Sequence, residues 1–250
     1  MKKSVIPVVV IAALMITFFF SCSKNDNNDV PIAGLMAFNL SPDQGAVAVT
    51  LSGNILPGNP LYYMSYSGVY LNIFAANRTV RTYDFISGAG LASTSYNFQR
   101  DKYYSHFFMG ARNNYTNVVV PDVIDSLSKG AASSGKAYIR YVNAIPDSSK
   151  PLVTMVANGD SIIKSWAPYT AVSGFAAVTP GPVAIAATNA GSINVARTIS
   201  VEAQKVYTVL LVGMPGASDA SRTVQIRYVI NGVLSQSTFR QDSAAVAQGR

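Results

Sequence analysis

The residue types that most often carry out chemistry are scarce in this chain of 250 residues. It contains one cysteine, Cys22, one histidine, His106, and one glutamate, Glu202. A catalytic triad needs a histidine held between a nucleophile and a carboxylate, and a zinc site needs grouped His or Cys ligands. Neither arrangement is indicated, and the Gly-x-Ser-x-Gly, phosphate-loop and dinucleotide-binding motifs do not occur. We therefore predict that the protein is not an enzyme, with no catalytic residues, no metal site and no cofactor. We expect His106 to be a hydrogen-bonded histidine on a strand.

Acidic side chains leave one enzymatic alternative open. Hydrolysis of a glycosidic bond needs two carboxyl groups that face each other across that bond. Asp43, Asp84 and Asp101 could serve in such a pair, but their spacing favours no two of them. A carboxylate-based hydrolase is therefore kept as a third functional hypothesis, after the two given below.

The single cysteine ends an apolar leader. Residues 1–4 form a short, positively charged segment, and residues 5–20 form an uncharged run of sixteen residues. As a helix this run would reach about 24 Å, less than the roughly 30 Å of a bilayer's hydrocarbon core, so a signal peptide fits better than a permanent span. The end of the run, Phe19-Phe20-Ser21-Cys22, resembles a bacterial lipobox, although Phe19 stands where leucine is usual. That resemblance implies that residues 1–21 are cleaved off and that the Cys22 thiol carries lipid.

The segment after Cys22 is polar and has no apolar periodicity. We interpret residues 22–32 as the lipidated cysteine and a flexible tether. Its Asp-containing sequence resembles the surface-export signals of lipoproteins of the Bacteroidetes type. The expected location is the outer membrane by a lipid anchor, and display at the cell surface or towards the periplasm stays open.

Three short matches, in the same order and 103 to 106 residues apart, indicate an internal repeat. Each pair joins an apolar strand-like run to a Pro or Gly turn. From them we predict a divergent first domain over residues 33–126, a linker over 127–136, a second domain over 137–239 and a frayed tail over 240–250. The matches are residues 38–43 with 142–147, 47–53 with 153–159, and 102–110 with 205–213.

The pattern between these landmarks is all-β. Apolar residues alternate with polar ones over short runs that turn signals separate, and hydrophobic residues make up 49 % of the chain against 12 % charged. We predict two tandem immunoglobulin-like β-sandwich domains without a helix. Tyr104 and Tyr207 match a tyrosine corner, and Asn231-Gly232 predicts a hairpin turn.

The Asn-x-x-Pro-Asp opening, the Val-rich strand that follows and the Lys-x-Tyr-Ser/Thr…Gly strand resemble the DUF4397 family of bacterial exported domains. The resemblance covers nearly all of the second repeat and is weaker in the longer, tyrosine-rich first one. It implies an extracytoplasmic β-sandwich, often in tandem, and carries no established activity.

The net charge and the distribution of tyrosines indicate which kinds of partner the protein could bind. The net charge of +7 falls to about +5 without Lys2 and Lys3 and forms no basic stripe, so we expect no nucleic-acid partner. Nine of the fourteen tyrosines lie in the first repeat, and Tyr83, Tyr96 and Arg100 are the candidate ligand surface. The first functional hypothesis is a membrane-anchored binding or adhesion module for a glycan or an envelope protein. The second is a structural spacer or assembly component without a soluble ligand.

Overall fold

The computed structural model describes residues 30–234, and of residues 130–134 it describes only the backbone. The expected signal peptide, Cys22, most of the tether and the tail after residue 239 lie outside the described residues. Among the described residues, no helix is long and apolar enough to cross a bilayer.

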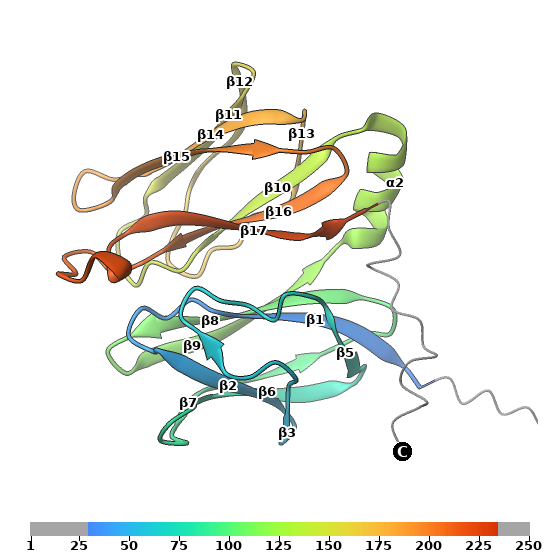
Figure 1. Ribbon diagram of the computed structural model, residues 1–250, viewed down its shortest axis with the longest axis vertical. Coiled ribbons are helices and arrows are strands. Elements are labelled where there is room, and N and C mark those ends of the chain that lie inside the picture. The colour runs from blue at the N-terminus through green and yellow to red at the C-terminus, as the bar shows by residue number, and fades with distance from the viewer. Residues whose placement is uncertain (1–29, 235–250) are drawn as a thin grey trace, which may run out of the picture. The chain divides into compact units, whose positions relative to one another are not determined.

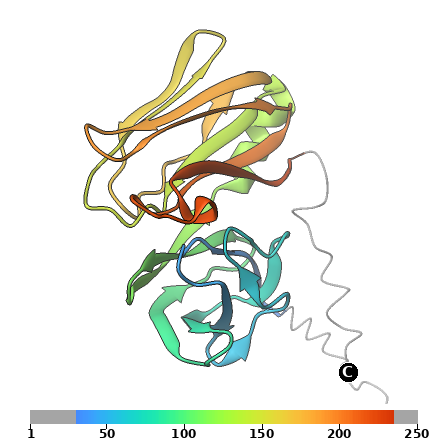
Figure 2. The same ribbon diagram turned by 60° about the vertical axis from the view of Figure 1, so that its left-hand side comes forward.

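The all-β prediction is confirmed, and the strands fall into two groups that can be followed in Figure 1 and Figure 2. Sandwich 1 consists of β1 (Ile32–Asn39), β2 (Ala46–Leu51), β3 (Asn54–Ile55), β4 (Leu61–Tyr62), β5 (Leu71–Phe74), β6 (Asn77–Asp84), β7 (Gly90–Asn97), β8 (Tyr103–Ala111) and β9 (Asn114–Asp122). Sandwich 2 consists of β10 (Ala137–Asn143), β11 (Leu152–Ala157), β12 (Asp160–Trp166), β13 (Ala176–Val178), β14 (Gly181–Thr188), β15 (Asn194–Val201), β16 (Lys205–Val212), the short 3-10 helix η2 (Ala220–Arg222) and β17 (Gln225–Val233).

The two sandwiches share one topology. In sandwich 1 the inner sheet has the order β5-β1-β8-β9 and the outer sheet β3-β2-β6-β7, with β4 added beside β2. In sandwich 2 the inner sheet is β13-β10-β16-β17 and the outer sheet β12-β11-β14-β15. Each inner sheet is built around one parallel pair, β1 with β8 or β10 with β16, and its other pairs are antiparallel.

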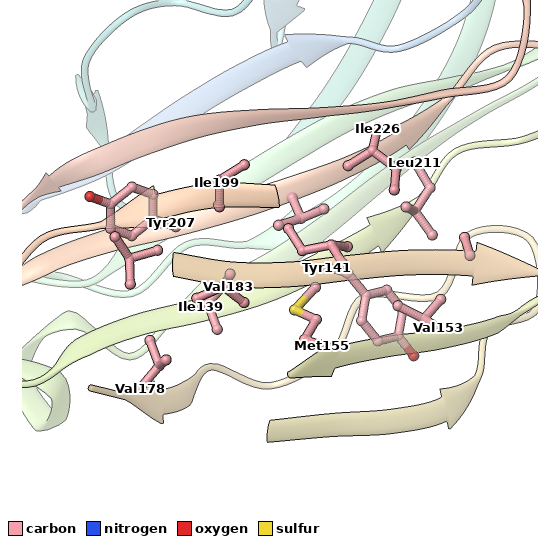
Figure 3. Close-up of a cluster of buried hydrophobic side chains, with 14 of the residues drawn as sticks. Ile139, Tyr141, Val153, Met155, Val178, Val183, Ile199, Tyr207, Leu211 and Ile226 are labelled. Carbon is pink, nitrogen blue, oxygen red and sulfur yellow. The ribbon is translucent and has the colours of Figure 1, made fainter. Parts of the chain in front are cut away.

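Three apolar layers hold these four sheets together. One core lies between the sheets of sandwich 1, and another, drawn in Figure 3, lies between the sheets of sandwich 2. A third joins the two inner sheets, where Phe38, Phe107 and Met109 of sandwich 1 pack with Val142 and Leu210 of sandwich 2. The central strands are therefore buried on both faces, and both sandwiches belong to one compact unit.

The expectation that the chain has no helix is wrong in the segment between the sandwiches. Helix α2 (Ile124–Ser134) covers most of the stretch that we assigned to a linker. Its first turns carry Ile124 and Leu127, one turn apart, and both are buried in the core between the inner sheets. This docking, rather than the intrinsic helix propensity of a Ser- and Gly-containing sequence, accounts for the helix.

The predicted hairpin at Asn231-Gly232 is also wrong. Strand β17 continues through both residues along β16, and the register shifts between Val206 and Tyr207, so that Asn231 becomes the extra residue of a β-bulge. The bulge aims the buried Asn231 side chain at the other sandwich, where its amide lies 3.5 Å from Tyr70 Oη.

The backbone conformation explains why each Lys-x-Tyr-Ser/Thr strand has a glycine near its end. Gly110 and Gly213 have φ values of 120° and 101°, and a Cβ on either would lie 2.1 Å from a carbonyl oxygen of the next strand or loop. No other residue fits so close an approach.

Candidate functional site

The structure does not bring the predicted ligand surface together. Tyr83 pairs with Gly90 and Tyr96 pairs with Arg78, so the two tyrosines lie at opposite ends of the β6–β7 hairpin. Tyr96 packs inward against Phe98 and Tyr104, while Tyr83 follows the buried, inward-facing Thr82 and faces outward. Arg100 forms an exposed ion pair with its neighbour Asp101. The three residues do not form a single surface.

Tyr83 instead lines a shallow hollow of about 330 Å³ on the outer sheet, together with Arg81 and residues 90–93. Phe85 and Ile86, in the turn after β6, are 48 % and 90 % exposed, and Tyr62 on β4 is 63 % exposed.

Tyr104 and Tyr207 hold corresponding corners. Each hydroxyl accepts a hydrogen bond from a backbone N–H five residues earlier, Gln99 N for Tyr104 and Glu202 N for Tyr207, both at 2.9 Å. This is the geometry of a tyrosine corner, and its role is to fix the entry to β8 and β16.

His106 lies fully buried on β8. Its Nε2 is 3.0 Å from Asn117 Oδ1, which also accepts from the Thr82 hydroxyl, and its Nδ1 has no partner among residues 30–234. Burial lowers the pKa of His106 to about 4, so the ring is neutral at pH 7. A neutral ring within a sandwich core has a packing role.

Two of the three acids considered for hydrolysis hold turns, while Asp101 pairs with Arg100. Asp43 accepts from Ser41 Oγ and Arg112 N, and Asp84 accepts from Ile86 N and from both Ser87 N and Oγ. These Ser87 hydrogen bonds lower the pKa of Asp84. Over the described range 30–234, no three His, Cys, Asp or Glu side chains group as metal ligands.

A buried polar network crosses the contact between the two inner sheets. Arg140 Nη1 donates to Asp122 Oδ1 at 2.6 Å, and both side chains are almost fully buried, at 2 % and 0 % exposure. Arg140 Nη2 donates to Ser105 Oγ, and its Nε donates to Thr208 Oγ1. The guanidinium also lies over Phe175, 4.3 Å from the ring centroid.

Asp122 completes the network from sandwich 1. Its Oδ2 accepts from Tyr70 Oη at 2.6 Å and from Ser105 Oγ at 2.7 Å. Burial, together with the Asp122 charge, raises the pKa of Tyr70 well above its usual value, so the hydroxyl stays protonated and donates. Every charged atom of the pair is engaged, which is the condition for a buried ion pair to be tolerated.

Sequence reasoning did not find this pair. The available signal was Arg140 itself, the only charged residue over 137–146, a stretch of mainly apolar residues. A buried charge needs a partner, but nothing in the sequence indicates that the partner is Asp122, at the end of a strand in the other sandwich.

A cleft of about 550 Å³ opens where the loops of both sandwiches meet. Sandwich 1 contributes the β8–β9 hairpin turn, and sandwich 2 contributes the loops after β10, β12 and β16. The cleft is lined by Ala111, Arg112, Asn114, Pro146, Asp147, Ser148, Pro168, Tyr169, Met214 and Pro215.

The Asn-x-x-Pro-Asp motif shapes one wall of this cleft. Asn143 Nδ2 donates to Ala167 O, immediately before Pro168 and Tyr169, and Thr170 N donates to Asn143 O. Asn143 Oδ1 accepts from Ile145 N, just before Pro146. One buried asparagine therefore holds two of the four lining segments in place.

The opposite wall is the β8–β9 turn. Arg112 and Asn113 both have positive φ, 54° and 63°, as the tight hairpin requires. Arg112 N donates to Asp43 Oδ2 at 2.6 Å, which fixes the backbone, while the exposed Arg112 guanidinium forms no ion pair with the described residues.

The cleft and the described ends of the chain lie at opposite ends of the sandwiches. The chain enters β1 and leaves β17 near α2, whereas the β8–β9 hairpin lies at the far end (Figure 1). The nine residues of β8 separate these ends by about 30 Å, at roughly 3.3 Å per residue.

These features define an all-β protein of two sandwiches joined by a buried contact, with a cleft of mixed polarity and no recognised catalytic arrangement in the described residues. A domain of unknown function, DUF4397, is found at residues 137–227, which confirms the resemblance for sandwich 2. No curated protein matches the chain.

Proposed function

We propose that this protein is a non-enzymatic binding module of the bacterial cell envelope, held to the outer membrane by lipid on Cys22. The observation that carries the binding role is the cleft, which both sandwiches build and whose walls are fixed by Asn143 and Asp43. Preformed clefts of 300 to 1,000 Å³ with a few polar groups are typical of ligand sites.

The anchoring proposal rests on the leader and on the course of the chain. Because β1 begins at the end of sandwich 1 opposite the cleft, a tether from Cys22 would join the sandwiches at a distance from the cleft. The resemblance of residues 19–22 to a lipobox supports lipidation, and two or three acyl chains give a lasting anchor where one gives only a marginal one.

We also propose that the two sandwiches are tandem repeats of one immunoglobulin-like domain. The common strand order of the sandwiches, the equivalent parallel pairs and the two tyrosine corners support a duplicated unit.

The anchor is tested by metabolic labelling with a clickable fatty acid. Cys22→Ala should abolish the label and release the protein from membranes, whereas the neighbouring change Ser23→Ala should leave both unchanged. A labelled, membrane-bound Cys22→Ala protein would overturn the anchoring proposal. Proteinase treatment of intact cells distinguishes surface display from a periplasmic orientation.

One observation favours the second candidate, a rigid spacer. The apolar contact between the inner sheets and the Arg140–Asp122 pair make the two sandwiches one body, which suits a component that holds a partner at a fixed distance. Recovery of a stable envelope partner whose binding survives changes in the cleft would favour the spacer over the binding module.

A further inference from the structure

We propose that the cleft between the sandwiches binds a neutral saccharide unit, so that the ligand of the proposed binding module is an envelope glycan. This inference rests on the proposed binding function and adds the chemical class of the ligand.

The charges around the cleft favour a neutral ligand. The lining contains one cationic side chain, Arg112, and one anionic side chain, Asp147, while Asn114 and Ser148 add uncharged donors and acceptors. Phosphate recognition relies on clustered Arg or Lys side chains, and cation binding relies on grouped carboxylates. The lining has neither cluster.

The polar groups suit hydroxyls in particular. Guanidinium, carboxylate and amide groups each present two hydrogen-bonding atoms in one plane, which can engage two neighbouring hydroxyls of a sugar ring. Asp147 Oδ1 already accepts from Ser149 N, so the carboxylate is held in place and its second oxygen remains for a ligand.

The apolar part of the lining suits the C–H face of a sugar. Pro146, Pro168 and Pro215 are rigid and have no N–H, and Tyr169 adds an aromatic ring. The Tyr169 hydroxyl is shielded from solvent and has no hydrogen-bond partner within residues 30–234. Burial raises the pKa of Tyr169 to about 12, so the ring, and not a charged oxygen, is what Tyr169 adds to the lining.

The backbone around the cleft argues against an extended peptide. Recognition by strand addition needs an open sheet edge whose N–H and C=O groups face the ligand. The cleft is instead lined by one hairpin turn and three loops. Because these segments are fixed before a ligand arrives, little conformational entropy is lost on binding.

The test uses the chain from residue 23 onward, which keeps both sandwiches. An array of neutral oligosaccharides is screened first, with sulfated and uronic-acid glycans and proline-rich peptides as comparison arms, and hits are measured by titration calorimetry. We expect a saturable neutral glycan whose affinity falls at least tenfold in Arg112→Asn and in Tyr169→Ala. Asparagine tolerates the positive φ of position 112, so the first variant should keep its fold.

The matched control is Arg81→Asn, the same change in the other hollow, on the outer sheet of sandwich 1. It should bind as the unchanged protein does. Loss of binding in Arg81→Asn but not in Arg112→Asn would overturn the assignment to the cleft. Cleft-dependent binding of a peptide or an anionic glycan instead would overturn the saccharide class and leave the proposed binding function standing. If no ligand depends on the cleft, both proposals fail, and the fatty-acid labelling still decides the anchor independently.

Discussion

Removing Arg140 should cost more stability than any exposed charge in the protein. Arg140→Met leaves Asp122 fully buried, with hydrogen bonds from Tyr70 and Ser105 but without a countercharge. Methionine is the matched replacement, because the register places Met36 opposite Ser105 in sandwich 1 where Arg140 stands opposite Thr208 in sandwich 2. Breaking a buried pair by removing one partner typically costs about 3–5 kcal/mol.

That loss is large against the roughly 5–15 kcal/mol by which domains are usually stable. Urea unfolding at pH 7 measures it by linear extrapolation. Lys164→Met, on the exposed side of β12, is the control and should change the free energy of unfolding by less than about 0.5 kcal/mol.

A double-mutant cycle separates the pair from the loss of packing. Asp122→Leu alone leaves the arginine buried and unpaired, whereas Arg140→Met with Asp122→Leu removes both charges. Because neither charge is then left without a partner, the double variant should be more stable than the sum of the two single losses predicts, by at least about 2 kcal/mol. The reasoning is refuted if Arg140→Met costs less than about 1 kcal/mol, or if the two single losses simply add.

Three further predictions concern the cores. The pKa of His106 is about 4 in the folded protein and about 6.5 in the unfolded chain. As the pH falls, the unfolded chain therefore takes up the proton first. This difference lowers the free energy of unfolding by about 3 kcal/mol between pH 7 and pH 4. Urea titrations over the same pH range should show that the free energy of unfolding of His106→Gln falls by about 3 kcal/mol less. The same fall with pH in both proteins would contradict this prediction. Tyr207→Phe should cost about 1 kcal/mol by leaving Glu202 N without its acceptor, while Tyr228→Phe should be nearly neutral, and equal losses would argue against the corner. Residues 137–234 expressed alone should self-associate in size-exclusion chromatography with light scattering, because the apolar face of the inner sheet is uncovered, and a stable monomer would show that the face needs no cover.

Local patterns in the sequence predicted the strands because they depend on local chemistry. Turn residues such as Pro146 and Gly213 and the alternation of apolar residues mark where a strand ends, whichever sheet it joins. The Asn231-Gly232 prediction failed because a turn signal is read from two residues alone. Here the strand continues along its neighbour, and the asparagine side chain is used in the buried contact between the sandwiches.

The separation of Tyr83 from Tyr96 was missed for a related reason. Choosing Tyr83 and Tyr96 together assumed that tyrosines near one hairpin share a face, whereas their facing depends on strand register and on the bulge between Thr82 and Tyr83. Neither is visible in composition. The cleft could not be predicted from the sequence either. Its ten lining residues come from four segments that only the contact between the sandwiches brings together.

Contact between the sandwiches did leave one trace in the sequence. A strand with one wet face alternates, but β16 reads as a nearly continuous apolar run, the pattern of strands covered on both faces. Such a run indicates that sandwich 2 is not a separate domain on a linker, because a lone sandwich would expose one of those faces. The buried Arg140–Asp122 pair then has a reason beyond stability. An apolar contact between two sheets tolerates sliding, whereas a paired charge with fixed hydrogen bonds is satisfied in one register only. Since the cleft takes one wall from each sandwich, a fixed register between the inner sheets also fixes the two walls of the cleft relative to each other.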